Sequence, residues 1–417
     1  PELVYALKDS GADILITDRA DVGDLADVVE QVIKLPDNYE TLLAEAEPAL
    51  LGEGINERDL AGLFYTGGTT GASKGVMLTH RNLIANSLNW LATVPQSEHD
   101  RSLVMAPMFH AAGSNGILAA IWQGALQVPL GTFDPAAVLD LIEKHRITMT
   151  LGVPSMLAAI AEEQHANPRD VSSLEVLTHG GSPIATEVVR RSCSAFPSTQ
   201  LVEVYGATET SPLVSLLGNE ETLMDDPLAR SCGRAVMGCS VSIKDADGTA
   251  LACGEVGEVV VSGTNVMAGY WNKPEQTAAV LKHGGYYTGD MGYLDDDGYL
   301  FLVDRSKDMI VSGGENVYST EVEEVLYRHP AVLEAAVFGV PDDKWGEAVH
   351  AVIVPRPENT EVQPEELIAF CREHIGGYKV PKGIDIQHEP LPKSGPGKVL
   401  KRDLRAPYWE GTDRAVN

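Results

Sequence analysis

The sequence predicts an α/β protein with a large N-terminal domain and a small α+β domain at its C-terminal end. Three observations support this prediction. The 417 residues are too many for one compact core. Apolar runs alternate with amphipathic helical segments in the first half, which favours a largely parallel sheet. After Arg230 the pattern changes to alternating, strand-like segments, which indicates mixed sheets and a β-rich part.

The composition narrows the classes of function. There are 31 basic and 60 acidic residues, a formal net charge of −29. Nucleic acids and anionic membranes bind basic surfaces, so neither is an expected partner. The five cysteines are scattered and form no Cys-x-x-Cys pair, so we expect reduced thiols and a cytoplasmic protein. No apolar stretch approaches the length of a transmembrane span, so we expect no integral membrane segment. The hydrophobic content of 44% is enough for a buried core.

The first elements follow from the spacing of apolar residues. Helical spacing over residues 2–10 is followed by a short apolar run at 14–16, which predicts a buried strand. Residues 21–56 are polar, acidic and weakly periodic, so we expect a loop with a short helix there. A strand is predicted over 60–65, immediately before a glycine-rich segment.

That segment, residues 66–76, reads Thr-Gly-Gly-Thr-Thr-Gly-Ala-Ser-Lys-Gly-Val. Glycines allow backbone N–H groups to approach an anion, hydroxyls donate further hydrogen bonds, and Lys74 adds a positive charge. The segment is not a Walker A loop, because Lys74 follows Ser73 and precedes Gly75. Its composition suits a phosphate-binding loop and also a polar surface loop, and composition alone does not separate the two.

The remaining elements continue the alternation and then change to strands. Beyond residue 304 a second unit of helices and strands begins, and Thr320 with Glu323 predicts a capping box for its first helix. We predict helices over residues 79–90, 136–145, 154–163, 320–326 and 365–375, and strands over 102–105, 148–151, 174–177, 201–205, 241–243, 258–262, 299–303, 332–340 and 348–354.

Polar residues follow two of the predicted strands. His110 comes after the strand at 102–105 and suits the floor of a pocket, although a packed histidine would give the same pattern. Tyr205 ends another strand and is suited to stacking on a purine, while Thr208 is suited to a phosphate oxygen. Glu209 is suited to Mg²⁺, which needs only one or two carboxylates when phosphates supply the other ligands. A metal would also explain how so acidic a protein binds a polyanion.

The glycine-rich string resembles the phosphate loop of adenylate-forming enzymes, which include acyl-CoA synthetases, luciferases and the adenylation domains of peptide synthetases. Motifs similar to those of that family follow in order: Pro-x-Phe-His at 107–110, Gly-Gly-x-Pro at 180–183, Tyr-Gly-x-Thr-Glu at 205–209, Thr-Gly-Asp at 288–290 and a Gly-Lys loop ending at Lys398. The resemblance covers residues 60 to 400. Members normally carry a segment before this point, and the chain begins without methionine, so we expect an N-terminally truncated chain.

The resemblance implies a role for each motif. As catalytic residues it implies Lys398, Glu209, Thr208 and His110, with Thr66 and Glu209 at the metal. For ATP and AMP it implies Thr66, Gly67, Gly68, Thr69, Thr70, Gly71, Lys74, Gly181, Ser182, Pro183, Glu203, Tyr205, Gly206, Asp290 and Arg305. For the acyl pocket it implies His110, Ala111, Ala112, Gly113, Gly180 and Ala207, and for CoA it implies Gly313, Gly314, Glu315 and Asn316.

The resemblance also implies the domain organisation. An adenylation domain would span residues 1–304 and a mobile lid domain would span 305–417, with the hinge near Lys307. In this family the lysine that corresponds to Lys398 serves the first step, and the small domain then rotates so that the Gly313-Gly314 loop faces the thiol. We found no internal repeat.

The implied reaction is the ATP-dependent activation of a carboxylic acid as acyl-AMP, followed by transfer to CoA, with Mg²⁺ as the metal. The acid would be a fatty acid or a phenylpropenoic acid of the feruloyl or coumaroyl type. Two alternatives stay open: loading of a carrier-protein pantetheine, and an inactive scaffold. The sequence leaves a homodimer open.

Overall fold

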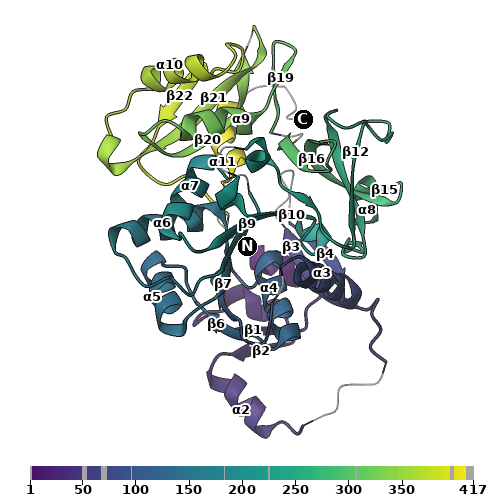
Figure 1. Ribbon diagram of the computed structural model, residues 1–417. Coiled ribbons are helices and arrows are strands. Elements are labelled where there is room, and N and C mark those ends of the chain that lie inside the picture. Colours follow the sequence, from purple (N-terminus) through teal and green to yellow (C-terminus); the bar gives the residue numbers. More distant parts are fainter. Residues whose placement is uncertain are drawn as a thin grey trace.

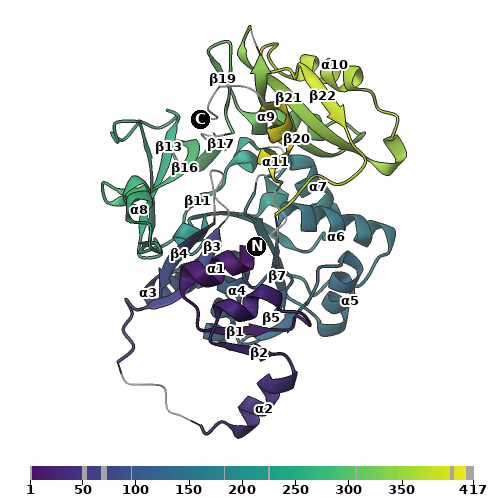
Figure 2. The same ribbon diagram turned by 180° about the vertical axis from the view of Figure 1, so that it is seen from behind.

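The computed structural model describes residues 2–48, 54–66, 73–94, 96–182, 184–223, 226–305, 308–342, 344–394 and 399–409. Figures 1 and 2 show a large body of helices and sheets, with a smaller body built from the last hundred residues above it. Parallel and antiparallel strands both occur, so the predicted α/β class with mixed sheets is confirmed. The helices are α1 (Glu2–Ser10), α2 (Asp37–Glu45), α3 (His80–Thr93), α4 (Ala111–Gln123), α5 (Pro135–His145), α6 (Pro154–Ala166), α7 (Thr186–Ala195), α8 (Pro274–Val280), α9 (Ser319–Tyr327), α10 (Pro364–His374) and α11 (Lys401–Trp409).

A seven-stranded sheet forms the centre of the large body, in the order β11-β10-β9-β8-β7-β5-β6. Its strands β6, β5, β7, β8 and β9 are parallel, while β10 and β11 are antiparallel. The carboxyl ends of parallel strands meet at one edge, which is where α/β proteins place their ligands. The bounds are β5 (Arg101–Val104), β6 (Leu126–Pro129), β7 (Met149–Gly152), β8 (Val176–Gly180), β9 (Gln200–Tyr205), β10 (Ser215–Gly218) and β11 (Arg234–Ala235).

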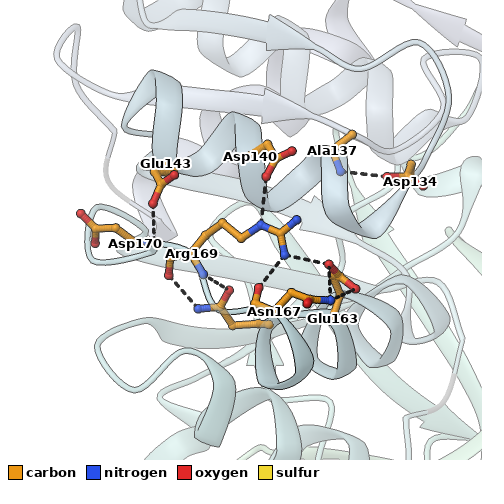
Figure 3. A network of polar contacts seen from close by, with 9 residues as sticks. Asp134, Ala137, Asp140, Glu143, Glu163, Asn167, Arg169 and Asp170 are labelled. Carbon is orange, nitrogen blue, oxygen red and sulfur yellow. Dashed lines mark hydrogen bonds and ion pairs between the residues drawn. The ribbon is translucent and has the colours of Figure 1, made fainter.

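Helices α5 and α6 pack on this sheet through a core that includes Leu139, Ile142 and Leu157, each fully buried. Figure 3 shows the polar contacts that join these two helices at the surface. The guanidinium of Arg169 donates to Asp140 of α5 at 2.9 Å and to Glu163 of α6 at 2.7 Å. The position of α6 relative to the sheet is therefore fixed by apolar packing and by this arginine.

Two antiparallel sheets complete the large body. One has the order β14-β4-β3, and the other has the order β12-β13-β16-β15 with β17 paired to β16. The second forms the predicted β-rich part. The bounds are β3 (Leu60–Thr66), β4 (Lys74–Thr79), β14 (Gly269–Tyr270), β12 (Cys239–Lys244), β13 (Gly257–Gly263), β15 (Leu281–Lys282), β16 (Gly285–Leu294) and β17 (Leu300–Arg305).

The N-terminal segment differs from the prediction in two ways. Strand β1 (Ile14–Thr17) exists, but its isoleucines are exposed, because it pairs only with β2 (Gln31–Lys34) in a two-stranded sheet. The prediction of a buried strand is therefore wrong. The segment 21–56 contains β2, α2 and a short 3-10 helix, and so has more regular structure than the expected loop.

The small body has a five-stranded sheet in the order β19-β18-β21-β20, with β22 paired to β21. A core around Val322, Leu326 and Ile353 joins this sheet to α9 and α10. The predicted capping box on α9 is wrong, because the Thr320 hydroxyl donates to the Val303 carbonyl instead, and Tyr318 is the N-cap. The bounds are β18 (Ile310–Ser312), β19 (Glu315–Val317), β20 (Val332–Asp342), β21 (Gly346–Pro355) and β22 (Gly383–Ile386).

Among the helices of the described ranges, none is both long enough and apolar enough to cross a membrane. The predicted domain boundary at 304/305 stays a prediction, and the predicted hinge residue Lys307 lies outside the described residues.

Candidate active site

The end of β9 meets β16 through a tyrosine and a carboxylate. Tyr205, the last residue of β9, donates from its hydroxyl to Oδ2 of Asp290 at 2.8 Å. Burial and the charge of Asp290 raise the pKa of Tyr205 well above its usual value, so the hydroxyl stays protonated and acts as the donor. The backbone N–H of Asp290 donates to Thr288 at 3.1 Å. Two predicted nucleotide motifs, Tyr-Gly-x-Thr-Glu at 205–209 and Thr-Gly-Asp at 288–290, therefore meet at this contact.

A second carboxylate lies just beyond β9, in the 3-10 helix η2 (Thr208–Thr210). The hydroxyl of Tyr270 donates to Oε1 of Glu209 at 2.7 Å. The ammonium of Lys74 lies 4.6 Å from the centre of the Tyr270 ring, which is cation–π distance. The structure thus brings Glu209 and Lys74, predicted from two distant motifs, to opposite parts of one tyrosine.

This arrangement fits a magnesium ion. Tyr270 takes one oxygen of Glu209, and no second partner of that carboxylate occurs among the described residues. A carboxylate with one oxygen oriented by a donor is suited to Mg²⁺ that is shared with phosphates. Thr66, the other predicted metal residue, pairs with Lys74 across the β3–β4 ladder.

The described residues include only part of the predicted phosphate loop. Lys74 was predicted within this loop, but it is the first residue of β4, because Val76 and Leu78 are fully buried and extend the strand. The predicted loop residues Gly67, Gly68, Thr69, Thr70 and Gly71 lie outside the described residues.

Several predicted glycines are required by close backbone packing. A Cβ atom on Gly180 would lie 2.1 Å from the Val204 carbonyl oxygen, and one on Gly206 would lie 1.5 Å from the Pro212 carbonyl oxygen. Gly181 has φ of +84°, which favours glycine. Ser182 follows it in the same turn, and Pro183 lies outside the described residues. The turn after β8 is therefore held tightly against β9.

A buried polar cluster beneath this turn was not predicted. Nε2 of His179 lies 2.5 Å from a carboxylate oxygen of Glu220, and both side chains are almost fully buried. Burial is the largest influence on the pKa of His179 and would lower it, but the charge of Glu220, the hydrogen bond to Glu220 and the charge of Glu203 together raise the pKa above its usual value. The pKa of Glu203 is raised to about 7, mainly by burial and then by the charge of Glu220. Glu203 is the Cα partner of His179 between β9 and β8.

Sequence reasoning missed Tyr270 and Glu220. Tyr270 lies 61 positions from Glu209, and Glu220 lies 41 positions from His179. Neither residue belongs to a motif that we recognised. His179 directly precedes the glycine turn and lies two positions after the strand predicted over 174–177, which was its only signal in the sequence.

Four of the residues predicted for the acyl pocket, His110 to Gly113, lie at the start of α4. His110 is its N-cap, and the N–H of Ala112 donates to its Nδ1 at 3.3 Å. Burial lowers the pKa of His110, so the ring is neutral and its proton is assigned to Nε2. Gly113 is required by packing, because a Cβ there would lie 2.3 Å from the Pro107 carbonyl oxygen. This contact accounts for a glycine at position 113, and the predicted place of Gly113 in the acyl pocket stays a prediction.

Ala207 is partly buried and packs against the cluster around Val76 and Tyr270. Ala111 is buried and Ala112 is partly buried. The extent of the acyl site stays a prediction.

The predicted CoA residues occupy a hairpin of the small body. Gly313 and Gly314 form its tip with φ of +63° and +87°, and Glu315 and Asn316 are exposed in β19. The N–H of Gly313 donates to the Trp345 carbonyl at 2.7 Å. Figure 1 places β19 at the edge of the small body.

The remaining predicted residues are only partly described. Arg305 of β17 is the strand partner of Asp290 in β16, and its side chain is not among those that the structure describes. Lys398 lies outside the described residues.

Comparison with protein families gives two matches along the chain. The model for AMP-binding enzymes matches residues 1–271, and the model for the C-terminal domain of AMP-binding enzymes matches residues 321–398.

Two relatives illustrate the similarity. A feruloyl-CoA synthase from Amycolatopsis sp is 40% identical over 97% of this chain and 81% of its own length. A medium/long-chain fatty-acid–CoA ligase from Mycobacterium tuberculosis is 36% identical over 99% of this chain and 76% of its own length.

Solved structures are also similar. ATP-bound MatB from Rhodopseudomonas palustris is 29% identical, covers 98% of this chain and 82% of that chain, and has a TM-score of 0.90, against 0.76 for apo MatB. The o-succinylbenzoate CoA synthetase of Bacillus subtilis, in complex with ATP and magnesium, is 33% identical over 97% of this chain and 81% of that chain, with a TM-score of 0.85.

Proposed function

The chain belongs to the AMP-binding enzyme family, and we propose that it is an ATP-dependent acyl-CoA synthetase that works through an acyl-adenylate. In the first step a carboxylate oxygen of the acid attacks the α-phosphorus of ATP, and pyrophosphate leaves. In the second step the sulfur of CoA attacks the acyl carbon, its proton passes to solvent, and AMP leaves. The enzyme is thus an acid–thiol ligase that uses ATP, Mg²⁺ and CoA.

One observation carries the proposal: two carboxylates and two tyrosine hydroxyls converge at the carboxyl end of β9. Asp290 and Glu209 each accept a hydrogen bond from a tyrosine, Tyr205 and Tyr270 respectively. We assign Asp290 to the ribose hydroxyls and Glu209 to Mg²⁺. The metal, when bound, neutralises phosphate charge that an acidic protein would otherwise repel.

The chain's own residues then act by binding and orientation. We assign the glycine turn Gly180–Gly181 and Ser182 to one face of the adenine, with Glu203 and Tyr205 at its edge. Thr66, Lys74 and Thr208 are assigned to phosphate oxygens. No side chain forms a covalent bond with the substrate in this scheme, so positioning and charge stabilisation supply the rate.

Two residues are assigned to the reacting carboxylate and phosphate. His110, held as a neutral imidazole by burial and by the N–H of Ala112, presents Nε2–H to the substrate carboxylate. Lys398 supplies a cation to the charge that develops at the α-phosphate. A preorganised cation at developing charge is among the larger catalytic effects.

We propose a fatty acid or a phenylpropenoic acid such as ferulate as the substrate. The support comes from the names of the two relatives and from the small residues Ala111, Ala112 and Ala207 around the predicted acyl site. A small side chain leaves room for an apolar tail and supplies no charge to a second acidic group.

The second step is assigned to the small domain. We propose that residues 305–417 rotate near Lys307 between the steps and bring Gly313, Gly314, Glu315 and Asn316 to the thiol. A cytoplasmic location is proposed from the expected reduced state of the thiols and from the need for ATP and CoA. A homodimer stays a prediction.

The test is direct product analysis. Purified protein is incubated with Mg²⁺, ATP and a panel of fatty and phenylpropenoic acids, with CoA or with a phosphopantetheinylated carrier protein, and products are identified by mass spectrometry. Acyl-CoA and AMP in equal amounts are expected. Transfer to the carrier protein alone would establish the pantetheine-loading alternative, and absence of acyl-adenylate with every acid would contradict the proposal.

A further inference from the structure

Helix α7 follows the adenine turn directly, and its first turn has no capping side chain of its own. Its N-cap is Ala185, which has no side-chain acceptor. The first N–H groups of a helix have no partner within the helix, and the helix dipole favours a negative charge at this end. A cap for α7 must therefore come from another element.

The small domain supplies that cap. Oε1 of Glu324, on α9, accepts a hydrogen bond from the Thr186 hydroxyl at 2.9 Å, and Oε2 lies 3.4 Å from the Thr186 N–H. Thr186 is the first residue of α7. The Glu324 side chain is 22% exposed and also lies 3.5 Å from Arg328 of its own helix. A carboxylate of the small domain thus occupies the helix end that supports the adenine turn of the large domain.

A second polar contact lies beside the first. Arg356, which follows β21, donates to Glu162 of α6 at 3.0 Å, and Glu162 lies 3.7 Å from Arg191 of α7. A small cavity beside this second contact is lined by Glu162, Arg191 and Arg356 and by apolar groups that include Val188 and Tyr327. Helices α6 and α7 therefore meet the small domain through charged groups around a thin apolar centre, which is an interface suited to repeated opening.

The helix that carries Glu324 is also joined to α11. Lys401, three positions after Lys398, lies 2.7 Å from Glu323 and donates to Ser319 at 2.8 Å, and both partners are on α9. A movement of α9 away from α7 would therefore carry the start of α11 with it. Helix α11 itself packs on the small domain, where Leu404 and Tyr408 contact the cluster around Phe338 of β20.

We propose that Glu324 is a positioning residue that caps α7 while the small domain stands as it does here, and that the cap favours the adenylation step. This inference rests on the proposed function. Rotation of the small domain would withdraw the carboxylate from Thr186, so the adenine turn would lose support in the state from which AMP leaves. The arrangement seen here matches ATP-bound MatB more closely than apo MatB.

The cap itself is tested by hydrogen exchange, which needs no activity. Peptides that cover the first turn of α7 are compared in wild type, Glu324→Ala, Glu324→Gln and the control Glu321→Gln. Glu321 is on the same helix but pairs with Lys379 inside the small domain. We expect exchange to become roughly threefold to tenfold faster in Glu324→Ala, less so in Glu324→Gln, and to be unchanged in the control. Equal protection in Glu324→Ala and wild type would overturn the proposal.

The functional part is tested on each half-reaction separately. Adenylation is followed as acid-dependent ATP–pyrophosphate exchange, and thioester formation is followed in single turnovers from the isolated acyl-adenylate and CoA. We expect Glu324→Ala and Thr186→Ala to slow exchange by about fivefold to tenfold while the thioester rate changes less than twofold. The double variant should be no slower than Glu324→Ala, because both changes remove one contact.

Equal losses in both half-reactions, or the same loss in Glu321→Gln, would overturn the assignment. If wild type shows no exchange with any acid, the proposed function fails, while the hydrogen-exchange comparison still decides whether the cap exists.

Discussion

At the scale of single residues, Glu209 depends on a tyrosine that lies outside every recognised motif. Tyr270 donates to it at 2.7 Å. We predict that Tyr270→Phe raises KM for Mg·ATP by about tenfold to 100-fold with a smaller change in kcat, because a hydrogen bond to a charged group contributes about 1.5–3 kcal/mol. Steady-state kinetics of acyl-CoA formation measure this.

Tyr293→Phe is the matched control, since Tyr293 stacks on Phe301 in the β-rich part and contacts neither carboxylate. An unchanged KM in Tyr270→Phe, or an equal rise in the control, would show that the hydroxyl does not orient Glu209.

The cluster of His179, Glu203 and Glu220 makes the free energy of unfolding depend on pH. The direction of this dependence follows from the direction of the pKa shifts. The pKa of Glu203 is raised from 4.5 to about 7, chiefly by burial. A carboxyl whose pKa is raised by folding stabilises the fold below pH 4.5, and this contribution is lost as pH rises through 7. The pKa of His179 is also raised above 6.5, so its contribution is lost in the same direction.

We therefore predict that Glu203→Gln, which imitates the neutral acid, equals wild type in unfolding free energy near pH 4.5 and exceeds it above pH 7. Glu203 is only partly buried, so solvent screening reduces the expected gain to about 1–2 kcal/mol. Urea unfolding at a series of pH values measures it. A difference that does not change with pH would contradict the raised pKa.

At the scale of elements, the connection after β9 is set by contact between backbones. A Cβ on Gly206 would lie 1.5 Å from the Pro212 carbonyl oxygen, whereas one on Gly116, inside α4, would meet nothing within 4 Å. We predict that Gly206→Ala lowers the unfolding free energy by about 2–4 kcal/mol and reduces adenylation, because the turn must shift.

Gly116→Ala should instead raise the unfolding free energy by up to about 1 kcal/mol, since alanine favours a helix interior. Thermal or urea unfolding of both variants and of wild type measures these changes in unfolding free energy. Similar effects of the two substitutions would mean that the close approach at Gly206 does not constrain the turn.

The spacing of apolar residues located most helices and strands. It did not show which other elements each of them packs against or pairs with. Helical spacing placed α5 and α10 to within about two residues, because one apolar face of each packs on a sheet. The apolar residues of β1 do not reveal that only one strand pairs with it, so Ile14 and Ile16 are exposed at 53% each. The capping pattern of Thr320 was satisfied by a distant carbonyl.

At the scale of the whole molecule, the sequence predicted the motifs that carry site residues. It did not predict most contacts between distant segments. The resemblance named Tyr205, Glu209 and Asp290 as members of one site, and the structure joins Tyr205 to Asp290 across 85 positions. The resemblance did not indicate a contact between Thr186 and Glu324, which are 138 positions apart. Such pairs depend on how two domains meet, and their residue types carry no periodicity or motif that local analysis recognises.

The central claim is that this chain adenylates a carboxylic acid with Lys398 as the cation at the α-phosphate. Carboxylate-dependent ATP–pyrophosphate exchange over fatty and phenylpropenoic acids, with wild type and Lys398→Ala, tests it most directly. The account predicts exchange with one class of acid and a loss of about 100-fold or more in the variant. Exchange that is absent with every acid from folded wild-type protein, or that is undiminished in Lys398→Ala, would contradict it.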